Sequence, residues 1–225
     1  WSQGPIQTGQ VKARIFDASG EPLTSSDVAL DDHVAGENHS LPRIAVDATG
    51  GFMVVYHAIY GAGDMNTDVV MRKYDSNGDR VGSRVKANVV SVGSQRHHRV
   101  DIDDNGNVVV AWISLANSTT ATDVIAREFD SDLNPLTDEG MVNVDTKSTR
   151  AHHVALSVNP GGSYMVGWVD DSGEDTSGRG IYVRRYDIEP SDPCSIAETI
   201  ATEIETMDLD KGPMTSLLAK VVALS

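Results

Sequence analysis

Two pairs of adjacent histidines are the residues of this sequence whose type and spacing most directly suggest chemistry. His97 and His98 lie in "QRHHRV", and His152 and His153 lie in "RAHHVAL", each just ahead of an alternating apolar and polar stretch. Neutral imidazole suits zinc, copper or nickel, so converging rings would form a divalent metal site. An earlier counterpart reads "HSLPR" and keeps only His39. The sequence favours partly exposed, solvated histidines over a metal site, because position along a chain does not show convergence.

A second candidate is the acidic turn "DIDDNG", whose oxygens suit a calcium ion. Asp101, Asp103 and Asn105 alternate along it and a glycine follows, as in a calcium loop. The glutamate that an EF-hand needs further on is replaced by Trp112, so the EF-hand is excluded. Calcium in a turn of another kind stays a hypothesis, to which "DDSGED" at 170–175 adds. An acidic hairpin without an ion is favoured, because the matching turns read "DATGG" and "NPGGS".

Catalytic motifs are not found. A sialidase-type box, S-x-D-x-G-x-x-T-W, places tryptophan four residues after glycine, whereas Trp112 follows Gly106 by six. Glycoside hydrolysis needs two placed carboxylates, and none of the 33 acidic residues stands out. The sequence also contains no G-x-S-x-G, no H-E-x-x-H and no glycine-rich phosphate loop.

The candidate residues belong to a sequence repeat. "GGFMVVY", "NGNVVVAW" and "GGSYMVGW" end at Tyr56, Trp112 and Trp168, which are 56 residues apart. An R-x-[FY]-D motif keeps step, with its aromatic residues 58, 55 and 57 residues apart at Phe16, Tyr74, Phe129 and Tyr186. A fixed period of this size is typical of stacked repeats or propellers.

The repeated aromatic and basic side chains are predicted to be structural. Tyr56, Trp112 and Trp168 end a strand-like run, and we expect them to fill the space between neighbouring repeats rather than stack on a ligand. The arginine of the second motif shares a strand face with the aromatic residue two positions later, so it can pack along the ring and pair with a carboxylate. This prediction applies to Arg72, Arg127 and Arg184.

Each repeat holds about four strand-like runs bounded by glycine, aspartate and asparagine turns. The expected strands are 43–47, 52–57, 68–74 and 84–89, then 99–103, 107–113, 123–129 and 141–144, then 153–158, 163–169 and 181–186. This pattern predicts an all-β fold of antiparallel four-stranded repeats, an incomplete β-propeller of about three blades, followed by a short C-terminal α-helical segment.

The best-defined repeat, "GWVDDSGEDTSGRGIYVRRYD" at 167–187, carries a family resemblance. With the preceding "HHVALSVNPGGSYMVGW", it resembles the repeats of secreted and surface-exposed bacterial proteins, with the pattern G-G-x-x-V-x-W, an acidic loop and G-I-Y-x-R-x-Y-D. The resemblance implies a non-catalytic, propeller-like surface module. The arrangement "DPC…LDKGPMTSLLAKV" is similar to the start of a helical module near the C-termini of such proteins.

The expected organisation is a repeat region at 1–187, divided into a partial repeat at 1–17 and full repeats at 18–74, 75–130 and 131–187. A linker follows at 188–194, then a truncated helical hairpin at 195–225, where Ile196, Ile200 and Ile204 have helical spacing. Residues 1–17 are one candidate for a missing outer strand of the third repeat. With only about three blades, we expect a fragment that forms an open arc or associates through its open blade faces.

Composition limits the partners. Lys and Arg number 18 against 33 Asp and Glu, a net charge of −15, which argues against nucleic acid. No apolar run is long enough to cross a bilayer, and the single cysteine, Cys194, cannot form a disulfide within the chain. The sequence thus predicts an extracellular or cell-surface binding or display scaffold with a protein or glycan ligand, and no cofactor except possible calcium. The alternatives are a fragment of a propeller glycoside hydrolase with its catalytic residues elsewhere, and a structural spacer.

Overall fold

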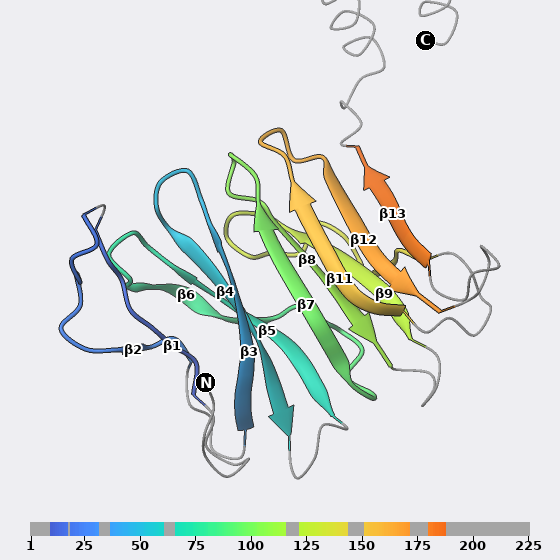
Figure 1. Ribbon diagram of the computed structural model, residues 1–225, viewed down its shortest axis with the longest axis horizontal. Coiled ribbons are helices and arrows are strands. Elements are labelled where there is room, and N and C mark those ends of the chain that lie inside the picture. Colours follow the sequence, from blue (N-terminus) through green and yellow to red (C-terminus); the bar gives the residue numbers. More distant parts are fainter. Residues whose placement is uncertain are drawn as a thin grey trace, which may run out of the picture. The chain divides into compact units, whose positions relative to one another are not determined.

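A computed structural model describes residues 10–17, 19–31, 37–60, 66–115, 122–143, 151–171 and 180–187 (Figure 1). Every regular element in these ranges is a β-strand, and every paired strand runs antiparallel to its neighbour within its sheet. In the same ranges there is no helix of the length and apolar character that a membrane span requires. The predicted helical hairpin at 195–225 lies outside the described residues.

Three sheets follow one another along the chain, each with its strands in sequence order. The first sheet contains β3 (Glu37–Val46), β4 (Phe52–Tyr60), β5 (Thr67–Tyr74) and β6 (Arg80–Lys86). The second contains β7 (Gln95–Ile102), β8 (Val108–Ser114), β9 (Asp123–Phe129) and β10 (Gly140–Met141). The third contains β11 (Ala151–Val158), β12 (Tyr164–Asp170) and β13 (Gly180–Tyr186), and a short pair, β1 (Lys12–Ala13) and β2 (Val28–Ala29), precedes them all.

The strands match the expected pattern, including the three strands expected for the third repeat. The expected strands at 84–89 and 141–144 also fall in the same sheets as the strands listed with them. The one difference concerns the repeat boundaries, because those after Tyr74 and Asp130 lie between the third and fourth strands of a sheet. The first and second sheets therefore each end inside the next of the expected repeat ranges.

Aspartate side chains close the hairpin turns. Asp47 Oδ1 accepts hydrogen bonds from the backbone N–H groups of Thr49 and Gly51 at 2.8 and 2.9 Å. Between them Gly50 adopts a positive φ of 84°, which glycine reaches without strain. The same pair of bonds, to the residues two and four positions later, is made by Asp17, Asp75, Asp103 and Asp130.

Apolar layers between consecutive sheets form the core. One layer joins the first and second sheets and another joins the second and third. Tyr56 and Trp112 are fully buried and Trp168 is 8% exposed, so all three aromatic residues are packed inside, where the repeat pattern places them. The Trp112 indole also donates a 2.9 Å hydrogen bond to Gln95 Oε1, so its one polar group is satisfied.

The repeated arginines tie each sheet to the one before it. Arg127 donates to the carbonyl of Ala87 at 2.9 Å and lies 5.3 Å over the Phe129 ring. Arg184 donates to the carbonyl of Val142 at 2.6 Å. The expected packing along the ring is present at Arg127, but the partners of these two arginines are backbone carbonyls rather than carboxylates. Arg72 is buried on β5 of the first sheet.

The N-terminal segment covers the first sheet and not the third. Val11 and Leu30 share an apolar cluster with β4 and β5. The Tyr74 hydroxyl donates to the Leu30 carbonyl, and Arg80 donates to the Asp31 carbonyl at 2.7 Å. The idea that residues 1–17 complete the third sheet is thus wrong for the described residues 10–17, which pack at the opposite end of the array.

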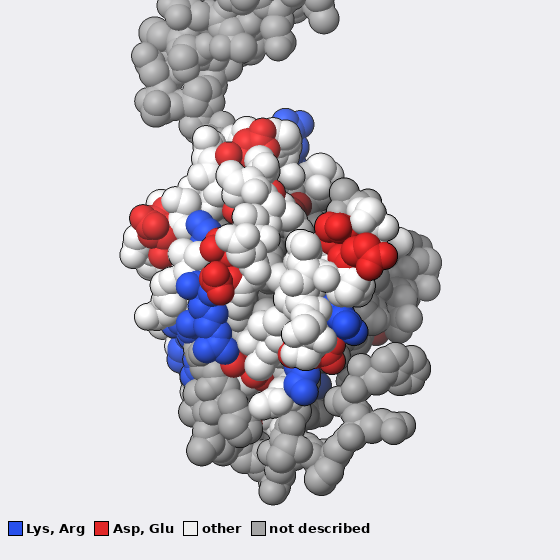
Figure 2. Space-filling view, turned by 90° about the vertical axis from the view of Figure 1, so that its left-hand side faces the viewer, with Lys and Arg blue, Asp and Glu red and all other residues white. Residues whose placement is uncertain are grey.

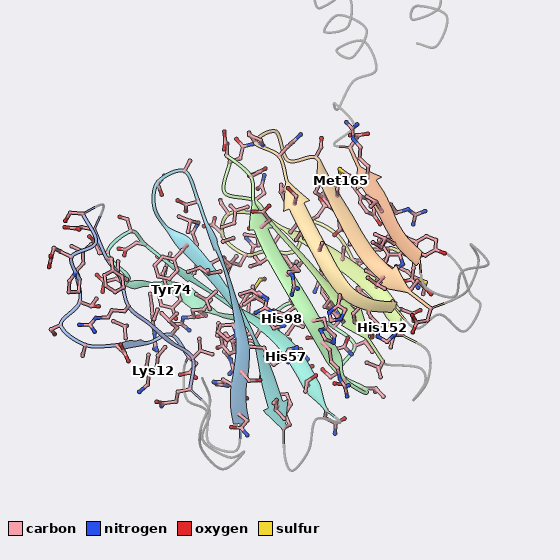
Figure 3. The ribbon with its side chains drawn as sticks, viewed as in Figure 1. Lys12, His57, Tyr74, His98, His152 and Met165 are labelled. Atoms are coloured by element: carbon pink, nitrogen blue, oxygen red, sulfur yellow. The ribbon has the colours of Figure 1, made fainter. Side chains whose placement is uncertain are left out.

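Both end faces of the array expose apolar side chains. Ile44 and Val46 on β3 are 57% and 63% exposed. On the outer face of the third sheet, Met165 (labelled in Figure 3), Ile181 and Val183 are 47%, 82% and 57% exposed. Within the described residues, no apolar cluster joins the first and third sheets, so these two faces do not cover one another.

Truncating the buried indole should destabilise the array. We expect Trp112→Ala to lower the free energy of unfolding by about 3–5 kcal/mol, because it leaves a cavity between two sheets. Phe16→Ala removes an aromatic ring that is 54% exposed and should cost about 0.5 kcal/mol or less. Urea denaturation of both variants measures the difference, and equal costs would show that the indole does not hold the sheets together.

The exposed end faces should drive association. We expect light scattering from the 225-residue chain to give a mass that rises with concentration above that of one chain. Ile181→Lys with Val183→Lys should return it to a monomer, whereas Lys12→Gln on β1 should not. A wild-type chain that stays monomeric at every concentration would contradict this expectation.

Candidate functional site

The first strands of the three sheets, β3, β7 and β11, form the candidate site. Each is the unpaired edge of its sheet, and β7 lies beside both β3 and β11 (Figure 1). We call their shared open side the inner edge. Each of these strands has a register shift in its pairing with the next strand. Bulges of this kind often occur at sheet edges and beside functional sites, where they redirect side chains.

A left-handed residue marks each bulge. Leu41, His97 and His153 have φ values of 53°, 54° and 49°, although none is glycine. Such a backbone conformation costs about 1–3 kcal/mol and persists only where the surrounding structure fixes it. In β7 and β11 the next residue, His98 or Val154, is 2% exposed and faces the preceding sheet. The bulge thus buries one side chain and turns the left-handed residue outward.

His97 and His153 are brought together by this geometry. Both are exposed, and their ring centroids lie 5.3 Å apart in an edge-to-face arrangement. Part of the His97 ring is still screened from water by its surroundings, and this partial desolvation lowers its pKa. The neighbouring His153, Arg99, Arg96 and His152 lower it further. His97 is therefore neutral near pH 7, so its ring can both donate and accept a hydrogen bond.

The other two predicted histidines lie elsewhere. His98 is buried, with Nε2 3.2 Å from the carbonyl oxygen of Val55 and its ring centroid 4.6 Å from that of His57 (Figure 3). Burial and His57 hold the pKa of His98 well below its usual value. His152 Nε2 lies 3.0 Å from a carboxylate oxygen of Asp171. The four histidines of the metal hypothesis therefore do not converge on one point.

Three arginines flank the exposed histidines. Arg43 follows the bulge of β3 and Arg99 follows that of β7, and each donates to the carbonyl of the preceding residue, at 2.9 and 2.8 Å. Arg96 Nε donates to Ser94 Oγ at 2.7 Å. Burial and the nearby charge of Arg43 lower the pKa of Arg99. Like charges are therefore gathered at the inner edge.

The residues of the calcium hypothesis have separate roles. Asp103 accepts the backbone N–H groups of Asn105 and Asn107 and the Asn107 side chain, at 2.9, 2.8 and 2.8 Å. Asp101 Oδ2 accepts the backbone N–H of Val158 at 2.8 Å and so ties β7 to β11. In the described part of the chain, no three His, Cys, Asp or Glu side chains form a group that could hold a metal ion.

A buried network of charged side chains beside β3 was not predicted from the sequence. His39 Nδ1 lies 2.9 Å from Asp31 Oδ2, and His39 Nε2 lies 2.9 Å from Glu37 Oε2. The Arg84 guanidinium donates two hydrogen bonds to the Glu37 carboxylate, at 2.6 and 3.1 Å. Because ionised carboxylates only accept hydrogen bonds, the ring nitrogens of His39 are the donors in these contacts.

This network is structural rather than catalytic. The side chains of Asp31, His39 and Glu37 are 0%, 1% and 8% exposed, and the imidazole occupies the space between the two carboxylates. A sugar therefore cannot enter between them, as a glycosidase pair would require. The sequence repeat could have indicated part of this network, because Asp31 stands at the repeat position that Asn88 and Asn143 occupy later in the chain. Each of these three side chains accepts a hydrogen bond from a backbone N–H group.

Comparisons with known proteins bear on the fold. No family model matches the chain, and no curated protein matches it in sequence. Among solved structures, an α-L-arabinanase from Penicillium chrysogenum complexed with arabinobiose superposes on 81% of this chain with a TM-score of 0.50 and 14% identity. An endo-arabinase from Bacteroides thetaiotaomicron matches 78% of it with a TM-score of 0.44 and 11% identity.

This likeness shows the fold alone. The described part of the chain is all-β, with antiparallel sheets arranged as in a propeller-like fold. The chain spans 51% and 65% of the lengths of the two arabinanase chains.

The Glu37 network predicts a pH-dependent stability. Arg84 and His39 hold the pKa of Glu37 below its usual value against the effect of burial, so Glu37 stabilises the fold above about pH 4.5 and loses this effect as pH falls through its lowered pKa. Glu37→Gln should cost about 1–3 kcal/mol at pH 7, because Arg84 and His39 lose a charged acceptor.

The variant and the wild type should become more alike below about pH 4.5. Urea denaturation at a series of pH values measures the difference. Glu21→Gln, at an exposed position, is the control and should leave the pH profile unchanged. A gap between wild type and Glu37→Gln that stays constant down to pH 3 would overturn the assignment.

Proposed function

We propose that this chain is part of a propeller glycoside hydrolase, with the inner edge as its glycan-binding surface and with catalytic carboxylates outside the described residues. The observation that carries the proposal is the repeated left-handed bulge, which turns His97 and His153 out of adjacent strands and brings their rings to 5.3 Å. Backbone strain repeated at one position of neighbouring edge strands is typical of a binding site. The arabinanase-like fold supports a carbohydrate ligand.

The side chains at the inner edge suit a sugar. Histidine and arginine supply the hydrogen-bond donors that sugar hydroxyls accept. Leu41, which is 54% exposed at the equivalent position of β3, adds an apolar contact for a ring face. An extracellular or cell-surface location, where polysaccharides are met, belongs to the same proposal.

A non-catalytic binding or display scaffold is the second candidate. It is favoured by the Asp31, His39 and Glu37 network, in which the His39 ring lies between the two carboxylates and leaves no space for a sugar. The two candidates share the glycan-binding surface and differ only in turnover. Release of reducing ends by the full-length protein, abolished by one carboxylate change, would decide for the hydrolase.

Binding can be tested on the 225-residue chain. We expect a panel of neutral and acidic oligosaccharides to include at least one ligand, measured by calorimetry. His97→Ala with His153→Ala should weaken its binding by about tenfold or more, because two ligand hydrogen bonds are lost. Phe16→Ala, on the N-terminal segment, should leave the affinity unchanged. A panel without any ligand, or an affinity that the histidine changes do not alter, would contradict the proposal.

A further inference from the structure

The inner edge gathers positive charge in a strongly acidic chain. Arg43 and Arg99 occupy the same position after the bulges of neighbouring strands, and the charge of Arg43 reaches Arg99. Neither makes an ion pair with any residue that the structure describes, although the chain contains 33 acidic residues and has a net charge of −15. On the side nearest the N-terminal segment, basic side chains lie among several groups of acidic ones (Figure 2).

The two guanidinium groups are oriented alike. One nitrogen of each donates to the carbonyl of the preceding residue, at 2.9 Å for Arg43 and 2.8 Å for Arg99. This bond restrains the guanidinium plane and leaves other N–H groups for a ligand. Arginine presents its donors in a planar fork that matches a carboxylate, so a fixed fork loses less freedom on binding.

From this geometry we infer that the inner edge binds the carboxylate of an acidic sugar, a uronic acid unit, through Arg43 and Arg99. His97 and His153 then hydrogen-bond the sugar hydroxyls beside it. The inference rests on the proposed glycan-binding function and specifies the charge of the ligand.

The same charges argue against the two other occupants. A divalent cation at His97 and His153 would be repelled by Arg43, Arg96 and Arg99. Nucleic acid carries many phosphates along its length and would meet a chain of net charge −15 around a small basic site. A short acidic glycan needs only the local charge.

The test compares three probes in phosphate-free buffer by calorimetry on the 225-residue chain. They are a trimer of galacturonic acid, a neutral trimer of galactose and sodium sulfate. We expect the acidic trimer to bind about tenfold or more tightly than the neutral one, and its affinity to fall as salt is raised. Sulfate alone should bind weakly and compete with the acidic trimer.

Variants locate the site. Arg43→Gln, Arg99→Gln and Arg99→Lys are compared with Lys12→Gln, which removes the same charge on β1 away from the inner edge (Figure 3). Each glutamine change at the inner edge should weaken the acidic trimer by about tenfold while leaving the neutral one unchanged. Arg99→Lys should retain part of the affinity, and Lys12→Gln all of it. Thermal melting confirms that each variant is folded.

The outcomes separate this inference from the proposed function. Equal affinity for the acidic and neutral trimers, unchanged by the arginine variants, would overturn the acidic specificity and leave glycan binding standing. Sulfate binding without any trimer binding would overturn both, because the arginines would then hold a simple anion. Failure of all three probes would also overturn the inference, while the wider glycan panel would still decide the proposed function.

Discussion

Each sheet has two apolar faces, and the burial of these faces against neighbouring elements determines the rest of the structure. Among the described residues only the outer face of the third sheet has no such cover. The second sheet is covered by the first sheet on one side and the third on the other. In the first sheet, one face of β4 and β5 packs against the second sheet. The other face packs against the N-terminal segment. The largest buried residues, Tyr56 and Trp112, belong to these layers. Face-to-face stacking of short sheets places their first strands side by side, and that placement creates the inner edge.

Hydrogen bonds between sheets give the stack its register. Arg127 and Arg184 donate to carbonyls of the preceding sheet, and Asp101 accepts from the backbone of the next inner strand. His98 reaches back to the Val55 carbonyl. These bonds are buried or partly buried and directional, whereas apolar contacts alone would allow the sheets to slide. At the bulges of β7 and β11 the residue after the left-handed one, His98 or Val154, is buried against the preceding sheet.

The repeat period made most of the fold readable from the sequence. Strand positions, hairpin turns and the burial of Tyr56, Trp112 and Trp168 follow from local pattern, because each depends on residues within one hairpin. The grouping of the fourth strands at 84–89 and 141–144 with the preceding three was also readable, although the repeat boundaries drawn after Tyr74 and Asp130 cut across the sheets. The position of the N-terminal segment, which packs on the first sheet, was not readable. The hydrogen-bond partners of Arg127 and Arg184 were not predicted, because every residue has a backbone carbonyl and the sequence does not show which one an arginine contacts.

The candidate site shows a sharper limit. Adjacent histidines look equivalent along the chain, yet a single bulge buries His98 at 2% exposure and leaves His97 exposed. A period of two along a regular strand would put neighbours on opposite faces in any case, but it would not predict a left-handed φ of 54°. Convergence of His97 with His153 rather than with His98 needs the sheets stacked in three dimensions. That stacking also brings Arg43 near Arg99 across 56 residues of sequence, so that positive charge gathers beside histidines whose sequence pattern gave no sign of it.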